Sequence, residues 1–123
     1  MLKTHHTRCR AQTTGAPDFV DVTDTVEAAL VDSGIRNGQV TIFAQGDGCS
    51  ILVNEHESGL LHDLKAAIDR LRAALPSSVI GSASVVLPAL EGRLGLGTWQ
   101  RVLLVELDRP SDRRLVVQVL GES

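Results

Sequence analysis

The pattern of hydrophobic and polar positions divides the chain into extended and helical segments. Residues 2–13 alternate with a period of two and are rich in polar side chains, which predicts an exposed β-strand. Residues 13–23 predict a turn followed by a short extended piece. Further strands are expected over 39–45, 49–54, 83–90, the Val- and Leu-rich part of 92–107, and 113–120. Asn37-Gly38 and Glu91-Gly92 are typical of turns.

The first helical segment is predicted to begin near Asp24. Glu27 follows three residues later and completes an N-terminal capping pattern. Val26 and Leu30 belong to an apolar face, and Gly34 is the residue type at which helices commonly end.

The second helical segment is longer and is predicted to run from about Glu55 to Leu75. Its apolar stripe recurs at three- and four-residue intervals (Leu60, Leu61, Leu64, Ala67, Ile68, Leu71, Ala74 and Leu75). Asn54 is the expected N-cap with Glu57 at the third helical position, and Pro76 ends the helix.

The resulting order is ββαββαβββ. Short turns between strands, with two helices set among them, predict an α+β fold rather than a parallel sheet. The strands 39–45 and 49–54 are expected to pair as a hairpin through Gly46-Asp47-Gly48, because Asp-Gly is a common two-strand connection. A length of 123 residues fits one domain spanning residues 1–123.

Composition narrows the classes of function. The chain is 43% hydrophobic with only three aromatic residues, so its core must be aliphatic. A net charge of −3 and mixed surface charges do not match a nucleic-acid-binding protein. No apolar run approaches the roughly 20 residues that cross a membrane. With no apolar leader segment and only two cysteines, Cys9 and Cys49, a cytoplasmic location is expected.

The glycine-rich stretch 45–50 has the composition of a phosphate-binding loop but not its pattern. A P-loop requires a Lys after the second glycine and a helix after that. Here Cys49 follows Gly48, a strand is expected next, and Asp47 would repel a phosphate. A tight turn is the better interpretation of this stretch.

The four histidines do not have metal-ligand spacing. His5 and His6 are adjacent in a strand and point to opposite faces, and His56 and His62 lie six residues apart. Solvated surface histidines explain them better than a metal site does.

The start of the long helix offers a candidate site. Glu55, Gly59 and Asp63 are spaced i, i+4, i+8, so on a helix they share one side, and Gly59 leaves a notch between the two carboxylates. Such a group suits Mg²⁺ coordination or proton transfer. The alternative is that both carboxylates simply face water. Gly95, Gly97 and the single tryptophan form a second unusual stretch, for which a bulge beside a core Trp is the simpler interpretation.

Several stretches resemble the YjbQ family in their sequence, order and spacing. This family is often labelled secondary thiamine-phosphate synthase. The stretches are VDVTDTV with GQVTIF, ILVNEHESGLLHDL, LEGRLGLGTWQRVLLVELDRP and RRLVVQVLGE. The similarity covers about residues 20–122, and its most specific parts are Asn54-Glu55, Asp63-Leu64 and the segment Gly92–Gln100.

The resemblance implies a two-sheet β-sandwich with two helices that assembles as a homotrimer. It implies a thiamine-phosphate synthase, which joins a pyrimidine diphosphate to a thiazole phosphate, and hence a small phosphorylated ligand and Mg or Zn. On this basis Glu55 and Asp63 are the candidate catalytic residues. The candidate ligand-binding residues are Asn54, Trp99, Gln100, Gly46 and Gly97.

The chain departs from the family at two histidines. Gly46-Asp47-Gly48-Cys49 stands where the family usually has His-Thr-Thr-Ala, and the family stretch with a second histidine, after the long helix, is missing. The predicted site therefore lacks both family histidines, so no bound metal is favoured and any activity is expected to be weak or absent. The other hypothesis is a catalytically silent trimer that binds a small ligand or has a structural role.

Overall fold

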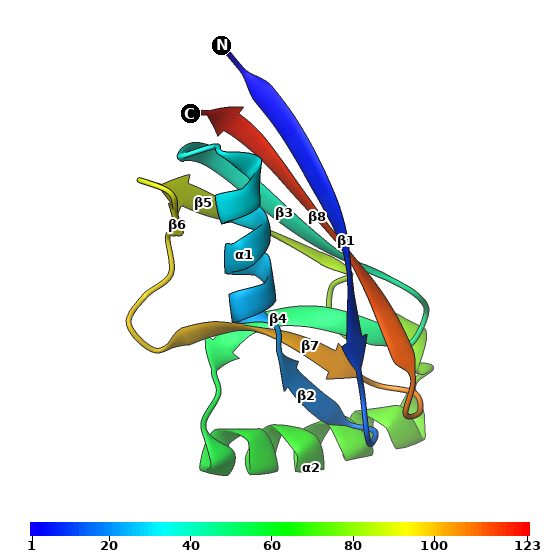
Figure 1. Cartoon of the computed structure of the whole chain (residues 1–123). Coiled ribbons are helices and arrows are strands. Elements are labelled where there is room, and N and C mark those ends of the chain that lie inside the picture. Colours follow the sequence, from blue (N-terminus) through cyan, green and yellow to red (C-terminus); the bar gives the residue numbers. More distant parts are fainter.

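The computed structural model describes residues 1–123 and contains two antiparallel sheets with two α-helices (Figure 1). The five-stranded sheet has the order β1-β8-β3-β5-β6, and the three-stranded sheet has the order β2-β7-β4. The elements are β1 (Lys3–Gln12), β2 (Asp18–Asp21), α1 (Thr23–Ser33), β3 (Asn37–Gln45), β4 (Cys49–Glu55), α2 (Ser58–Ala74), a 3₁₀ turn (Ser77–Val79), β5 (Ser84–Leu90), β6 (Arg93–Leu94), β7 (Gln100–Glu106) and β8 (Asp112–Glu122). The α+β class and the two-sheet arrangement are thus confirmed.

The hydrophobic core lies between the two sheets and is aliphatic, as the composition predicts. The five-stranded sheet contributes alternate residues such as Ile42 and Val117, and the three-stranded sheet contributes Val102 and Leu104. Helix α1 adds Leu30, which is fully buried. Alternation along each strand directs one set of side chains into this layer and the other set outward.

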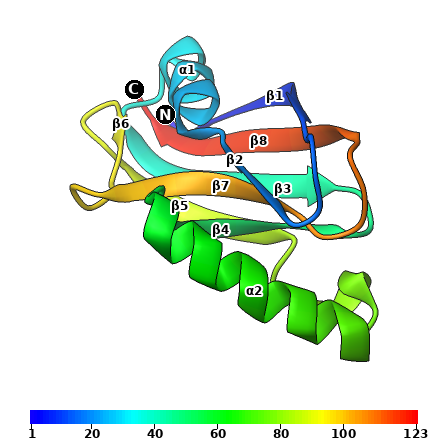
Figure 2. The same ribbon diagram turned by 90° about the horizontal axis from the view of Figure 1, so that it is seen from below.

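Helix α2 covers the outer face of the three-stranded sheet (Figure 2). Strand β7 is therefore buried on both sides, which explains why Val102–Leu107 is a continuous buried run rather than an alternating one. The helix itself packs lightly, since none of its residues is fully buried. Leu64 and Ile68 face an apolar cavity of about 450 Å³ beneath it.

Some local predictions are confirmed. Helix α1 ends at Gly34, which adopts the left-handed conformation with φ of 70°. Helix α2 ends at Ala74, just before Pro76. The turn at Glu91-Gly92 joins β5 to β6, and the polar alternating segment near the N-terminus forms the strand β1.

Other local predictions are wrong. Strands β3 and β4 do not form a hairpin: β3 pairs with β5 and β8, whereas β4 pairs with β7 in the other sheet. Gly46-Asp47-Gly48 therefore connects two sheets. Asn37-Gly38 is the start of β3 instead of a turn, because Gly38 lies against the backbone of Gly121. The Val- and Leu-rich part of 92–107 does form a strand as predicted, β7, but the unpredicted two-residue strand β6 precedes it and belongs to the other sheet.

The helix starts also differ from the sequence prediction. Val22 is the N-cap of α1 and makes no side-chain cap bond. Helix α2 begins at Ser58, three residues later than expected, and Glu57 is its N-cap in place of Asn54. Asn54 and Glu55 are the last residues of β4, because their backbone pairs with β7.

Candidate functional site

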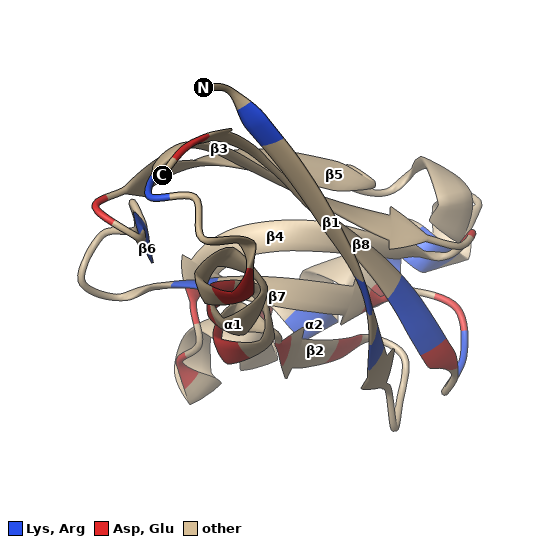
Figure 3. Ribbon diagram, turned by 45° about the horizontal axis from the view of Figure 1, so that its top comes forward, with Lys and Arg blue, Asp and Glu red and all other residues tan.

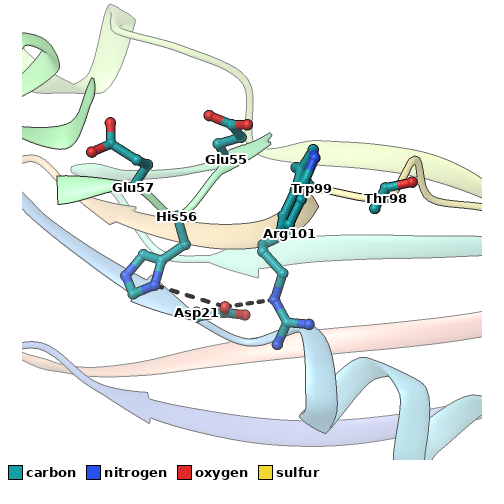
Figure 4. Close-up of a pocket in the computed structure, with 7 residues that line it drawn as sticks. All are labelled: Asp21, Glu55, His56, Glu57, Thr98, Trp99 and Arg101. Carbon is teal, nitrogen blue, oxygen red and sulfur yellow. Dashed lines mark hydrogen bonds and ion pairs between the residues drawn. The ribbon is translucent and has the colours of Figure 1, made fainter. Parts of the chain in front are cut away.

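A cavity of about 510 Å³ lies where β4 ends and β7 begins (Figure 4). We call it the Trp99 cavity. Its lining comes from three separate segments: Asp21 from β2, Glu55, His56 and Glu57 from the β4–α2 connection, and Thr98, Trp99 and Arg101 from the start of β7.

Antiparallel pairing brings two of these segments together. Glu55 lies directly opposite Gln100, and Asn54 lies opposite Arg101, in the register of β4 with β7. Residues on both sides of this pairing then extend past the sheet edge as two loops. The cavity lies between those loops, and Asp21 of β2 completes its wall.

Arg101 is held by two carboxylates. Its Nε donates to Oδ2 of Asp21 at 2.7 Å, and its Nη2 lies 3.3 Å from Oδ1 of Asp24. Nδ1 of His56 lies 4.0 Å from the same Asp21 oxygen. Burial alone would raise the pKa of Asp21, but hydrogen bonds from Arg101 and from Thr23 outweigh it and lower that pKa. Asp21 is therefore a carboxylate at neutral pH, and the charge of Arg101 is satisfied within the chain.

Glu57 has a structural task at the edge of the cavity. Its carboxylate accepts hydrogen bonds from the backbone N–H groups of Gly59 and Leu60, each at 2.8 Å. These bonds lower the pKa of Glu57 and cap the first turn of α2. Ser, Thr, Asp and Asn are the usual caps, and the longer Glu side chain performs the same role here.

Trp99 is the exposed aromatic surface of the cavity, with 72% of its area accessible. The loop that carries it is tied at its base, where the Gly97 N–H donates to Oε1 of Gln100 at 2.8 Å and the Gln100 N–H donates back to the Gly97 carbonyl at 3.1 Å. Trp99 is thus a surface residue, and the interpretation as a core Trp beside a bulge is wrong.

The structure brings some of the sequence-predicted site residues together and separates others. Glu55 and Trp99 line the cavity, while Gln100 and Gly97 shape its loop. Asn54 lies beside the cavity, where its Oδ1 accepts from the Glu55 N–H at 2.8 Å. The helical row of Glu55, Gly59 and Asp63 does not exist, because Glu55 belongs to β4 and Asp63 is an exposed residue of α2.

Gly46 lies away from the cavity, before the other end of β4. Its loop is fastened by an ion pair between Arg113 and Glu106, whose side chains are 11% and 0% exposed. Nη1 of Arg113 donates to the Asp47 carbonyl at 3.0 Å, and the Cys49 thiol lies 3.5 Å from the Gly46 carbonyl. Burial raises the pKa of Cys49, with partial opposition from Arg113. This loop therefore joins the sheets through a structural ion pair.

The residues present do not fit the metal that the resemblance implies. No group of three or more His, Cys, Asp or Glu side chains in the chain is arranged to hold an ion. Of the acids around the Trp99 cavity, Asp21 is engaged by Arg101 and Glu57 caps α2. Glu55 is then the one acid of the cavity wall that neither task occupies, and a single carboxylate is a poor ligand set for a metal ion.

Sequence reasoning did not single out Asp21, His56, Thr98 or Arg101 as site residues. Asp21 and Arg101 are 80 positions apart, and no local pattern predicts that β2 and β4 flank β7. The sequence holds only one indication of these residues: His56 directly follows Glu55, and Arg101 directly follows Gln100, and both of the preceding residues are predicted site residues.

Comparison with known proteins assigns the family. The family model described as UPF0047 protein YjbQ-like matches residues 7–122. The chain belongs to the YjbQ family. A UPF0047 protein of this family from Methanothermobacter thermautotrophicus is 33% identical over 120 residues, covering 85% of this chain and 84% of its own. One from Archaeoglobus fulgidus is 34% identical over 119 residues, covering 84% and 91%.

Solved structures of the YjbQ family agree with the fold. A YbjQ-like protein of unknown function from Sulfolobus solfataricus superposes with a TM-score of 0.92 at 33% identity, covering 99% of this chain and 100% of its own. A hypothetical protein from Aeropyrum pernix gives 0.87 at 30% identity, covering 96% and 99%. None of these YjbQ relatives is named by an activity. No helix of the chain is both long and apolar enough to span a membrane.

Proposed function

We propose that this protein binds a small, flat, positively charged molecule in the Trp99 cavity. One observation carries the proposal: three carboxylates and an exposed indole surround a cavity whose only guanidinium is already paired. The surplus of negative charge favours a cation over a phosphate. The indole face adds a cation–π attraction that aliphatic side chains do not offer.

Glu55 and Trp99 have complementary roles in this proposal. Glu55 is an exposed carboxylate whose side chain makes no hydrogen bond or ion pair within the chain, so its charge is available to a ligand. Trp99 supplies a flat surface for stacking, and its fixed loop limits the ordering cost of binding. A molecule that carries a delocalised ring cation satisfies both residues.

Thiamine is the first probe, since it combines a permanent thiazolium charge with an aminopyrimidine ring. Its uncharged flat oxidation product, thiochrome, is the matched control. Trp99 is the only tryptophan, so its indole N–H gives a single reporter signal in a ¹⁵N NMR spectrum. We expect thiamine to shift that signal and thiochrome to bind more weakly. Equal binding of the two, or no shift with thiamine, would contradict the proposal.

Variants separate the cavity from the rest of the surface. Trp99→Ala, followed by calorimetry, is expected to weaken thiamine binding by roughly 2- to 30-fold, the range of a cation–π contact. Glu55→Gln should weaken it as well. Asp63→Asn removes an equal charge outside the cavity and is expected to leave affinity unchanged.

Weak thiamine-phosphate synthase activity is the second candidate function. The family resemblance supports it, as does the placement of Glu55 beside an aromatic surface on which a pyrimidine ring can stack. The paired state of Arg101 counts against it, because a diphosphate leaving group needs an available cation. The test is pyrophosphate release from the two precursors with added Mg²⁺. Release that requires both precursors and is lost in Glu55→Gln would establish the synthase, and absence of such release would eliminate it.

We also propose that the chain, acting as one unit over residues 1–123, forms a homotrimer. Besides the resemblance, exposed apolar residues support this assembly: Val86, Leu90 and Leu120 are 57%, 56% and 38% exposed on the uncovered face of the five-stranded sheet. Light scattering should give three times the 13.1 kDa chain mass. A monomer that persists at high concentration would reject this assembly.

A cytoplasmic location is the last part of the proposal. Cys9 and Cys49 are both free thiols, which suits a reducing compartment. Cell fractionation tests it, and recovery of the protein outside the cytoplasmic fraction would contradict it.

A further inference from the structure

A second cavity, of about 490 Å³, lies on the five-stranded sheet and is rich in arginine. It is lined by Arg8, Cys9, Arg10, Gln45 and Arg114. Figure 3 shows blue bands, which mark Lys and Arg, on the neighbouring strands β1 and β8. We call it the arginine cavity, and it is distinct from the Trp99 cavity in every lining residue.

The strand register explains how the arginines gather. Arg10 lies directly opposite Arg114, and Arg114 lies opposite Gln45 on its other side. Arg8 is two residues from Arg10, so both point to the same outward face of β1. Three guanidinium groups thus project from neighbouring positions on one uncovered face of the sheet.

This arrangement is electrostatically unfavourable in the chain alone. Like charges directly opposite one another destabilise an antiparallel pair. Asp112 offers the only acidic contact, at 3.5 Å from Nη1 of Arg10, and both of those side chains are largely exposed. Arg8 and Arg114 have no hydrogen bond or ion pair within the chain, and the side chain of Gln45 has none either.

We propose that the arginine cavity binds the phosphate group of a small phosphorylated molecule. The planar donor fork of arginine matches the oxygens of phosphate and can bind it bidentately. The Gln45 amide adds a neutral donor beside the pair of facing arginines. An anion in this position removes the repulsion between Arg10 and Arg114.

The size of the patch favours a small anion over a nucleic acid. Arg10 and Arg114 face each other on neighbouring strands, and Arg8 lies two residues from Arg10 along β1. The patch therefore spans about 7 Å. A duplex or single strand requires a longer basic track, and the chain as a whole carries a net charge of −3. One phosphate or diphosphate group fits this span.

The experiment uses the full chain with two probes, inorganic phosphate and pyrophosphate, measured by calorimetry at low salt. We expect pyrophosphate to bind more tightly than phosphate, because it engages more guanidinium groups. Arg114→Gln should weaken pyrophosphate binding by about tenfold or more. Arg93→Gln removes an exposed arginine on β6 and should change affinity by less than about twofold.

A stability measurement excludes a merely structural role for Arg114. Since Arg114→Gln relieves a like-charge contact, it is expected to raise the melting temperature of the ligand-free protein and to abolish the further rise that pyrophosphate gives. A lowered melting temperature together with unchanged pyrophosphate affinity would overturn the proposal. So would undetectable binding of both probes, or binding of a short oligonucleotide far more tightly than of pyrophosphate. Thiamine binding is measured separately through the Trp99 signal, so a negative result at one cavity does not decide the proposal for the other.

Discussion

Asp21 accepts a hydrogen bond from Nε of Arg101 at 2.7 Å, joining two residues that lie 80 positions apart. The bond neutralises the one guanidinium that faces the Trp99 cavity. The surplus negative charge of this cavity therefore comes from Glu55 and Glu57. The remaining carboxylate of the wall, Glu55, is left to act on a ligand.

Replacing Asp21 with Asn is expected to reduce the preference of the cavity for a cation. The variant keeps the size of the side chain but removes the shorter of the two carboxylate contacts of Arg101, so the cavity becomes less negative and thiamine should bind several-fold more weakly. The indole N–H signal of Trp99 reports the titration. Asp24→Asn is the control, because Asp24 is 93% exposed and 3.3 Å from the guanidinium, and its loss should have a smaller effect.

Much of the fold follows from local patterns in the sequence. Period-two alternation placed most of the strands, and the three- and four-residue spacing placed both helices. Gly34 and Pro76 ended those helices for reasons that operate within a few residues: a left-handed conformation that glycine adopts easily, and a ring that cannot continue a helix. Such signals need no knowledge of the partner strands.

The candidate site depends on pairings that local patterns do not contain. Asn54 has a good capping side chain, yet pairing with β7 keeps the backbone extended through Glu55 and moves the cap to Glu57. Asp47-Gly48 is a typical hairpin sequence, yet β7 is a better partner for β4 than β3 is, because both are buried on two faces over much of their length. Strand pairing in the folded protein thus prevails over two local preferences, the N-cap at Asn54 and the hairpin turn at Asp47-Gly48. Both positions lie next to predicted site residues.

Gln100 is expected to position Trp99 without contributing greatly to stability. Its Oε1 accepts from the Gly97 N–H, and both residues are exposed. Gln100→Leu should loosen the loop, broaden the indole N–H signal and weaken thiamine binding. The free energy of unfolding should change by less than about 1 kcal/mol. Gln100→Glu retains an acceptor and should keep the loop ordered, so broadening in both variants would contradict the role assigned to this bond.

Gly121 is expected to tolerate no side chain. It lies opposite Gly38, and a Cβ at Gly121 would collide with the carbonyl oxygen of Asn37, which is backbone and cannot move aside. Gly121→Ala should therefore destabilise the protein by about 1–3 kcal/mol or more in urea denaturation. Gly15→Ala is the control, because its nearest neighbour would lie 4.0 Å away. Equal effects of the two substitutions would contradict the close approach of β3 and β8.

The ion pair of Glu106 with Arg113 predicts how stability depends on pH. Burial alone would raise the pKa of Glu106, but hydrogen bonds from Arg113, Thr13 and the Asp108 backbone lower it below its ordinary value of 4.5. Between the lower pKa of the folded state and the ordinary value of about 4.5, the unfolded chain binds more protons than the folded chain. The ion pair therefore contributes its full stabilisation above about pH 4.5, and this stabilisation disappears as the pH falls through the lower folded pKa.

Glu106→Gln tests that contribution directly. At pH 7 it leaves the guanidinium of Arg113 without its buried partner, and the free energy of unfolding should fall by about 3 kcal/mol. The deficit relative to the parent protein should shrink as the pH is lowered, because the parent loses the same ion pair by protonation. Urea denaturation at a series of pH values measures both curves. Glu91→Gln is the matched control, since its pair with Arg36 is exposed and should contribute less than about 1 kcal/mol at any pH. A deficit for Glu106→Gln that stays constant down to about pH 2 would show that Glu106 does not act through its charge.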